Sequence, residues 1–331
     1  MTQMSILEAV NRALADAMEA DDKVLVLGED VGVDGGVFRA TDGLLNRFGE
    51  HRVLDTPLAE ATIAGLSVGL AAQGFRPVAE IQFMGFLYTC LDQMISHASR
   101  LRNRTRGRLN CPMVLRAPYG GGIGAPEHHS ESMEALFAHV PGQRVVIPSS
   151  PARAYGLLLA AIRDPDPVVF LEPKRIYRAF KEEVSADGEP LPLDTCFILR
   201  AGTDVSLVSW GAMIAECLVA ADALAEEGVS CEVIDVATLN LLDRTTILAS
   251  VEKTGRAVIV EEAPRHVGFG AEIAALLAEQ GLFSLRAPVK RVAGYDTIMP
   301  LPRLEKHYMP GSVDVAMAAR ELMEFESSCR C

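Results

Sequence analysis

Several features that would place this chain in common protein classes are missing from its sequence. No apolar run approaches the ~20 residues that a membrane-spanning helix needs. The opening residues, Met-Thr-Gln-Met-Ser, lack the basic, apolar and small-residue pattern of a secretion signal. Basic residues are also in the minority, since 31 Lys and Arg stand against 44 Asp and Glu, a formal charge of −13. These absences argue against a membrane or nucleic-acid partner and predict a cytoplasmic protein.

The cysteines of the sequence do not indicate disulfide bonds or a metal site. The seven cysteines are scattered, odd in number and include no C-x-x-C pair. We therefore expect reduced thiols in a reducing compartment. The two cysteines of the terminal Cys329-Arg330-Cys331 follow polar residues and are predicted to lie in a frayed tail.

Short apolar strands and amphipathic helices alternate along the chain. In the first half, strands are predicted at 23–27, 52–55, 77–83, 113–116, 145–148 and 168–171, and helices at 5–20, from Thr56-Pro57 onward, at 86–102 and at 151–163. In the second half, strands are predicted at 204–210, 231–236, 257–261 and 289–292, with helices at 212–227, 244–253 and 270–280. The alternation is typical of α/β domains with parallel sheets.

The length and a change of composition predict two domains. At 331 residues the chain is too long for one ordinary core. Residues 173–200 are rich in charge, Gly and Pro, so we expect a first α/β domain at 1–180, a linker at 181–200 and a smaller second α/β domain at 201–331.

Glu60 opens a helix that is unusually rich in Gly and Ala. As an ordinary residue, a Glu in a first helical turn complements the helix dipole. However, Gly65 and Gly69 each cost about 1 kcal/mol relative to Ala, which predicts another backbone packed close by. A carboxylate at the head of such a contact would be desolvated, and its pKa would rise.

Two glycine-rich segments and one histidine pair do not match the patterns of other common binding sites. The run Gly120–Gly124 precedes His128 and His129 but has no P-loop Lys, so it predicts a flexible loop rather than a phosphate cradle. The adjacent histidines have no partners at zinc-ligand spacing. Gly268-Phe269-Gly270 lacks the third small residue and the strand context of a dinucleotide fingerprint, which disfavours a dinucleotide-dependent oxidoreductase.

Motifs along nearly the whole chain resemble one family. They include Asp55-Thr56-Pro57-Leu58-Ala59-Glu60, Arg76-Pro77-Val78-Ala79-Glu80-Ile81-Gln82-Phe83, Asp92-Gln93, His129-Ser130, Pro141-Gly142, the run 163–178, Val233-Ile234-Asp235-Val236 and Lys253-Thr254-Gly255-Arg256. In this order they resemble the β subunit of the thiamine-diphosphate-dependent E1 component of 2-oxo acid dehydrogenases. The resemblance implies a transketolase-like pyrimidine-binding domain followed by a transketolase C-terminal-like domain.

The resemblance also implies roles for individual residues. Glu60 would hydrogen-bond N1′ of the aminopyrimidine of thiamine diphosphate and relay a proton through the cofactor. Phe86, otherwise an ordinary core residue, would stack on that ring, and Leu58 and Gln82 would line the same pocket. His129 would orient the 2-oxo acid and assist transfer to a lipoyl group.

Other parts of the site would come from elsewhere. The sequence has no Gly-Asp-Gly, the family's usual anchor for Mg²⁺ and diphosphate. We therefore expect an α subunit to hold Mg²⁺ in an α₂β₂ heterotetramer that acylates E2, and we expect the chain alone to be inactive. The run 164–167 would by itself indicate a turn. By resemblance it could hold K⁺ through oxygens of Met113, Val114, Ala161, Asp164 and Asp166.

The substrate is the least determined property. Glu172–Arg178 and Gly294–Thr297 favour a branched-chain 2-oxo acid, with pyruvate or acetoin dehydrogenase E1β as the alternative. A non-catalytic scaffold is a further alternative, but Glu60, Phe86 and His129 are all intact.

Overall fold

The chain, seen here in a computed structural model, is described over residues 1–328 and packs as two units. The prediction for Cys329 and Cys331 lies outside these residues. Unit 1 comprises Met1–Tyr119 and Leu136–Leu193, and unit 2 comprises Gly120–Ala135 and the described residues from Asp194 onward. The domain limits inferred from the sequence, at 180 and 201, stay a prediction.

Unit 1 is built on a parallel sheet. Its strands run in the order β6 (Arg144–Val146), β7 (Val168–Pro173), β5 (Val114–Tyr119), β4 (Arg76–Glu80), β2 (Val24–Gly28) and β3 (Val53–Asp55). Every neighbouring pair is parallel, with Val26 opposite Val78 and Leu115 opposite Val169. The four central strands are buried throughout or nearly so, as strands covered on both faces should be.

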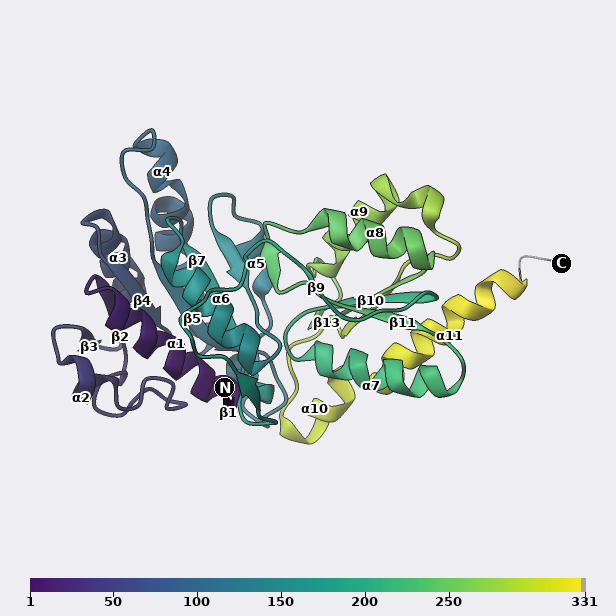
Figure 1. Cartoon of the computed structure of the whole chain (residues 1–331), viewed down its shortest axis with the longest axis horizontal. Coiled ribbons are helices and arrows are strands. Elements are labelled where there is room, and N and C mark those ends of the chain that lie inside the picture. Colours follow the sequence, from purple (N-terminus) through teal and green to yellow (C-terminus); the bar gives the residue numbers. More distant parts are fainter. Residues whose placement is uncertain (329–331) are drawn as a thin grey trace. The chain divides into compact units, whose positions relative to one another are not determined.

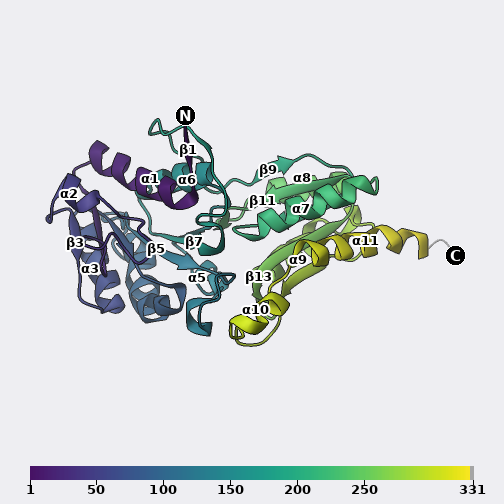
Figure 2. The ribbon, with the colours of Figure 1, turned by 90° about the horizontal axis from the view of Figure 1, so that it is seen from below.

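Helices cover this sheet on both faces. Figure 2 shows α1 (Ile6–Ala20) and α6 (Pro151–Arg163) side by side on one face and α3 (Glu60–Ala72) on the other. Helix α1 begins with a capping box, because the Ser5 hydroxyl accepts from the Glu8 N–H and the Glu8 carboxylate accepts from the Ser5 N–H. The remaining elements of unit 1 are β1 (Thr2–Met4), which pairs antiparallel with β8 (Glu182–Val184), α2 (Leu44–Phe48), η1 (Met84–Cys90), η2 (Gln93–His97), η3 (Ala98–Arg100), α4 (Leu101–Arg104) and η5 (Lys174–Ile176).

Two helix predictions in unit 1 were wrong in detail. Helix α3 begins at Glu60 rather than at Thr56-Pro57, because Thr56 still donates to the carbonyl of Gly28 at 2.9 Å and so continues the edge of the sheet. The predicted helix over 86–102 is broken into 3₁₀ turns, a π turn and the short α4. Hydrophobic spacing shows which side chains are buried but does not distinguish these tighter and wider coils.

The described residues do not provide the close backbone packing expected around α3. A Cβ on Gly69 would meet nothing within 4 Å, and one on Gly65 would meet only the side chain of Gln93, at 3.2 Å. Gly69 and Leu66 are exposed.

Unit 2 is a second α/β layer structure whose sheet is mixed. The strand order is β14 (Lys290–Gly294), β13 (Ala257–Pro264), β10 (Val205–Ser209), β11 (Cys231–Asp235) and β9 (Phe197–Arg200). The first four strands are parallel, but β9 is antiparallel to β11. The α/β class is confirmed, while the prediction of a purely parallel second sheet was wrong at this edge strand.

Two pairs of helices enclose the second sheet. In Figure 1, α8 (Arg244–Thr254) and α9 (Gly270–Gln280) lie on one face, and α7 (Met213–Glu226) and α11 (Ser312–Ser328) on the other. The other elements are η4 (Glu127–His129), α5 (Glu134–Ala138), which crosses the limit between the units, β12 (Thr238–Asn240), η6 (Leu282–Ser284) and α10 (Pro302–Tyr308).

None of the described helices is both long and apolar enough to cross a membrane.

Candidate functional site

The residues predicted to bind the pyrimidine lie after the carboxyl ends of neighbouring strands of unit 1, together with two further acids. Glu29 and Asp30 follow β2, the segment leading to Glu60 follows β3, and Gln82 and Phe86 follow β4. Because β2, β3 and β4 are neighbours and parallel, these segments leave the sheet at one edge. This edge is where open α/β sheets bind ligands.

Asp55 fixes the loop that follows β2. Its carboxylate accepts the N–H of Gly32 at 2.6 Å and the N–H of Val33 at 3.2 Å. A Cβ on Gly32 would lie 2.8 Å from that carboxylate, so the contact requires a residue without a side chain. The first residue of the Asp55–Glu60 motif therefore organises the loop beside the candidate site.

Glu60 has a second carboxylate close to it. It is the first residue of α3 and is half-buried, and Glu29 is buried. Burial raises the pKa of Glu29, the negative charge of Glu60 raises it further, and the N–H of Ala59 lowers it in part by donating to the carboxylate. The Oε1 atom of Glu29 is buried without a hydrogen-bond partner. A proton is therefore more easily retained at Glu29 than at an ordinary surface glutamate.

Gln82, Phe86 and Leu58 complete the set in unit 1. The Nε2 atom of Gln82 donates to the Asp30 carboxylate at 3.2 Å. Phe86 is half-buried in η1 and stands edge-on to Phe83, with ring centroids 6.0 Å apart. Leu58 is 78% exposed.

Glu29 and Asp30 were not predicted as site residues. The signal was present in the sequence, because a buried strand, Val24–Gly28, runs directly into two adjacent acids. What the sequence does not give is the parallel register of β2 with β3, which brings Glu29 next to Glu60.

His129 lies in unit 2. It ends the 3₁₀ turn η4, where its N–H donates to the carbonyl of Pro126 at 2.9 Å, and its ring is half-buried. His128 is exposed. The neighbouring Ser130 is buried and donates its hydroxyl to the carbonyl of Ala125 at 3.3 Å.

The glycine run before His129 is fastened by carboxylates rather than loose. The N–H groups of Gly122 and Gly124 donate to the two oxygens of Glu305 at 2.7 and 3.0 Å. The N–H of Gly121 donates to Glu262 Oε1 at 3.2 Å. The prediction of a flexible loop is therefore replaced by a loop held by the chain's own anions. Those anions occupy the N–H groups that a phosphate would need.

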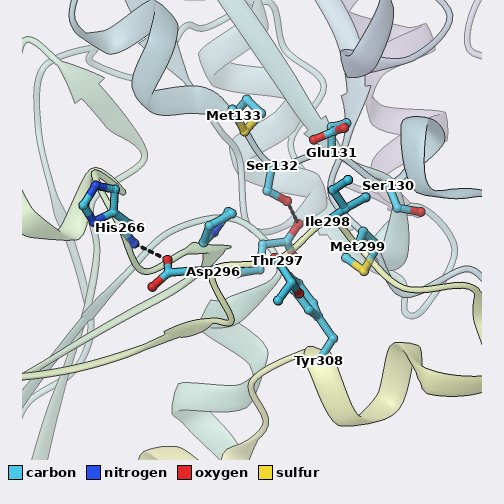
Figure 3. A pocket seen from close by; sticks show the side chains of 12 residues that line it. Ser130, Glu131, Ser132, Met133, His266, Asp296, Thr297, Ile298, Met299 and Tyr308 are labelled. Atoms are coloured by element: carbon cyan, nitrogen blue, oxygen red, sulfur yellow. Dashed lines mark hydrogen bonds between the residues drawn. The ribbon is translucent and has the colours of Figure 1, made fainter.

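A cavity of about 380 Å³ lies behind this loop, within unit 2 (Figure 3). Its walls come from 130–133, the end of β13 and the segment 296–299, with Tyr308 at one side. In the wall, Ser132 donates to Glu262 Oε1 at 2.6 Å, and the N–H of His266 donates to Asp296 at 2.5 Å. Two carboxylates of this wall, those of Glu262 and Asp296, are thus already hydrogen-bonded within the unit.

Several of the oxygens proposed to bind potassium already have partners within the chain. Asp164 and Asp166 form ion pairs with Arg144 at 3.2 Å and Arg102 at 2.7 Å. The carbonyl of Met113 accepts the N–H of Val168 at 3.0 Å. Val114 and Ala161 are buried beside this loop, in β5 and α6. Among the described residues no group of three or more His, Cys, Asp and Glu forms a metal site. A potassium ion at the loop stays a prediction.

The glycine pair considered for a dinucleotide has a different function. Contrary to expectation, Gly268 does lie between a strand, β13, and a helix, α9, which begins at Gly270. However, the N–H of Gly270 donates to Glu261 Oε2 at 2.9 Å, and a Cβ on Gly268 would lie 2.7 Å from the same atom. A buried carboxyl therefore occupies the place where this motif binds diphosphate, and burial raises its pKa to about 7.

Comparison with known proteins agrees with this architecture. Residues 2–179 match the family described as "Transketolase, pyrimidine binding domain", and residues 194–315 match "Transketolase, C-terminal domain". The pyruvate dehydrogenase E1 component subunit beta of Bacillus subtilis (strain 168) is 49% identical over 325 residues, which are 98% of this chain and 100% of the relative. The chain belongs to the E1 β-subunit family of 2-oxo acid dehydrogenases.

Other E1 β subunits and solved structures extend the comparison. The pyruvate dehydrogenase E1 component subunit beta of Acholeplasma laidlawii is 48% identical over 322 residues, covering 97% of this chain and 98% of the relative. The inactive β₄ tetramer of a split-gene transketolase has a TM-score of 0.81 at 23% identity and covers 98% of this chain and 100% of that chain. The latter likeness shows a shared fold only.

Proposed function

We propose that this chain is the β subunit of a pyruvate dehydrogenase E1 component that works with an α subunit. The observation that carries the proposal is the group formed by Glu60, Glu29, Gln82 and Phe86 at one sheet edge. The relatives named pyruvate dehydrogenase E1 component subunit beta support it, because they match 98% of this chain. These relatives favour pyruvate over the branched-chain 2-oxo acid that the sequence motifs suggested.

The residues at this edge fit one half of a thiamine-diphosphate site. The half-site has a buried carboxyl oxygen of Glu29 without a partner, an exposed Leu58 and a half-buried Phe86. A flat, hydrogen-bonding ring would cover these groups and give the Glu29 oxygen a partner. Bound thiamine diphosphate supplies the carbanion chemistry that a 2-oxo acid needs to lose CO₂. Mg²⁺ and the diphosphate would be held by the α subunit, since this chain has no Gly-Asp-Gly.

Each residue would have a limited task. Glu60 would hold or release a proton at N1′ of the pyrimidine. Phe86 would stack on the ring, while Gln82 and Leu58 would exclude water beside it. His129 would orient the 2-oxo acid and assist acyl transfer to a lipoyl group of E2. A cytoplasmic location also stays a prediction.

The open face of α3 supports the need for a partner. Gly69 has free space around it, and Leu66 and Leu58 are 46% and 78% exposed. Helices with apolar residues on all sides are normally buried. An α subunit covering this face would complete both the packing and the cofactor site.

Reconstitution tests the proposal. The chain would be co-purified with an α chain that carries Gly-Asp-Gly, and kcat/KM would be measured on pyruvate and on 2-oxoisovalerate. We expect activity only in the mixture and a preference for pyruvate of at least about tenfold, equivalent to ~1.4 kcal/mol in the transition state. A preference for 2-oxoisovalerate would restore the branched-chain assignment, and activity of the chain alone would contradict the shared site.

Potassium is tested separately. An ion at the Asp164–Asp166 loop would bind the folded chain and raise its thermal midpoint in KCl above that in NaCl. Equal midpoints would show that no potassium ion binds at this loop.

A further inference from the structure

Unit 1 contains a buried ionic network that the cofactor chemistry does not use. Arg116, in the middle of β5, is 1% exposed. Its Nε and Nη2 atoms donate to the two oxygens of Glu172 at 2.7 and 2.9 Å, and its Nη1 atom donates to Glu80. The hydroxyl of Tyr177 donates to Glu172 Oε2 at 2.6 Å. The four groups come from β4, β5 and β7 and the turn after β7.

Stability alone is a poor explanation for this network. Two carboxyls face one guanidinium, and burial raises the pKa of Glu80. Apolar residues of similar volume often replace buried ion pairs at no cost to stability. A network of hydrogen bonds with fixed directions does, however, hold backbone segments in one arrangement.

One side of the network leads directly to the candidate site. Glu80 is the last residue of β4, and Gln82 follows two residues later. A Cβ on Gly36 would lie 2.7 Å from Glu80 Oε1, so the loop that carries Asp30 also packs on this carboxyl. Gln82 and Asp30 are hydrogen-bonded to each other.

The other side leads to the site through aromatic rings. The ring of Tyr177 is 5.3 Å from that of Phe38, and Phe38 is 5.6 Å from Phe83. Phe83 is 6.0 Å from Phe86 in an edge-to-face contact. These are ordinary distances for aromatic pairs, each worth about 0.5–1.5 kcal/mol beyond burial. Tyr177 is thus joined to Phe86 by a continuous series of ring contacts.

We propose that Tyr177 and Arg116 are positioning residues for the pyrimidine half-site. Tyr177 fixes Phe86 through the aromatic series, and Arg116 fixes Gln82 through Glu80. The inference rests on the proposed function for its effect on the cofactor. Neither residue would touch the cofactor itself.

Tyr177→Phe is the informative variant, because it removes one hydroxyl and keeps the ring. Tyr155→Phe is a matched control. Tyr155 is also in unit 1 and 2% exposed, and its hydroxyl donates to an Asp16 carboxylate at 2.8 Å. Tyr155 is in α6, away from the ring series. Each variant loses one hydroxyl–carboxylate hydrogen bond, and Tyr155→Phe also loses the bond that its hydroxyl accepts from the Gly188 N–H at 2.9 Å.

Two readouts separate positioning from general destabilisation. In the complex reconstituted with the α chain, Tyr177→Phe should raise the Kd of thiamine diphosphate and lower kcat, and the product of the two changes should be roughly tenfold. This is about the factor, or less, that a hydrogen bond to a charged group is worth. In the chain alone, amide hydrogen exchange over residues 82–89 should accelerate. Tyr155→Phe should change neither property, even if both variants melt at the same temperature.

The outcomes are distinct. Equal effects of the two variants, or unchanged exchange over 82–89 in Tyr177→Phe, would overturn the positioning inference. If the wild-type complex does not bind thiamine diphosphate, the proposed function fails, whereas the exchange measurement still decides whether Tyr177 orders the Gln82–Phe86 segment.

Discussion

Replacing Glu134 with Gln should remove part of the pH dependence of the free energy of unfolding of unit 2. Glu134 is fully buried at the start of α5, and the indole N–H of Trp210 donates to its Oε1 at 3.1 Å. Burial raises the pKa of Glu134 to about 8. Between pH 4.5 and 8 the folded chain therefore keeps a proton that the unfolded chain releases. The free energy of unfolding contributed by this residue falls as the pH rises through that range.

The structure sets the size of the effect. A rise in pKa from 4.5 to about 8 corresponds to at most about 5 kcal/mol, at ~1.4 kcal/mol per pH unit. The variant is not free of cost, because its amide N–H₂ would occupy the site of Oε2, which is buried without a hydrogen-bond partner. An unpaired donor costs about 1–3 kcal/mol. We expect Glu134→Gln to be no more stable than wild type at pH 4.5 and about 2–4 kcal/mol more stable at pH 9.

Trp210 provides the assay. It is the only tryptophan in the chain, so its fluorescence during urea unfolding reports on the unit that contains Glu134. Glu279→Gln, an exposed substitution in α9, is the control for a change of net charge and should leave the difference between pH 4.5 and pH 9 unaltered. A Glu134→Gln variant with the same pH profile as wild type would refute the reasoning, because the proton would then not be retained by Glu134.

Two further predictions concern packing and thiol chemistry. In the isolated chain, Gly69→Ala should raise the free energy of unfolding by up to about 1 kcal/mol, because the added Cβ meets no atom within 4 Å. Gly202→Ala should lower it by about 1–3 kcal/mol or more, because its Cβ would lie 2.1 Å from the carbonyl carbon of Cys231. Urea titrations that give the opposite order of stability would contradict both predictions. Burial raises the pKa of Cys90, Cys111 and Cys217 to about 12, so iodoacetamide at pH 8 should leave these thiols unmodified in the folded chain while it labels glutathione. Rapid labelling of any of the three, detected by peptide mass spectrometry, would show that it is more accessible than the structure indicates.

The sequence predicts the α/β class and most element positions, because buried parallel strands and helices have distinct apolar patterns. It fails where hydrogen bonds across the fold decide the outcome. The edge pairing at Thr56 delays the start of α3, and β9 joins the second sheet antiparallel from within the predicted linker. No local pattern encodes either event, because both depend on a partner strand far away in the sequence.

The candidate site divides in the same way. Glu60, Gln82 and Phe86 were found because they stand in recognisable motifs. Glu29 needed the register of β2, and the link from Tyr177 to Phe86 needed three ring contacts that no spacing predicts. Roles assigned by resemblance, including that of His129, stay predictions.

Glu60→Gln in the complex reconstituted with the α chain tests the central claim most directly. The amide keeps the size and a hydrogen bond of Glu60 but cannot exchange a proton with N1′, and general acid–base catalysis is worth about 10²–10⁴-fold in rate. Turnover of pyruvate should fall by at least about a hundredfold while size-exclusion chromatography shows an unchanged assembly. Full turnover in an intact Glu60→Gln complex would contradict the claim that this segment supplies the acid–base half of the active site.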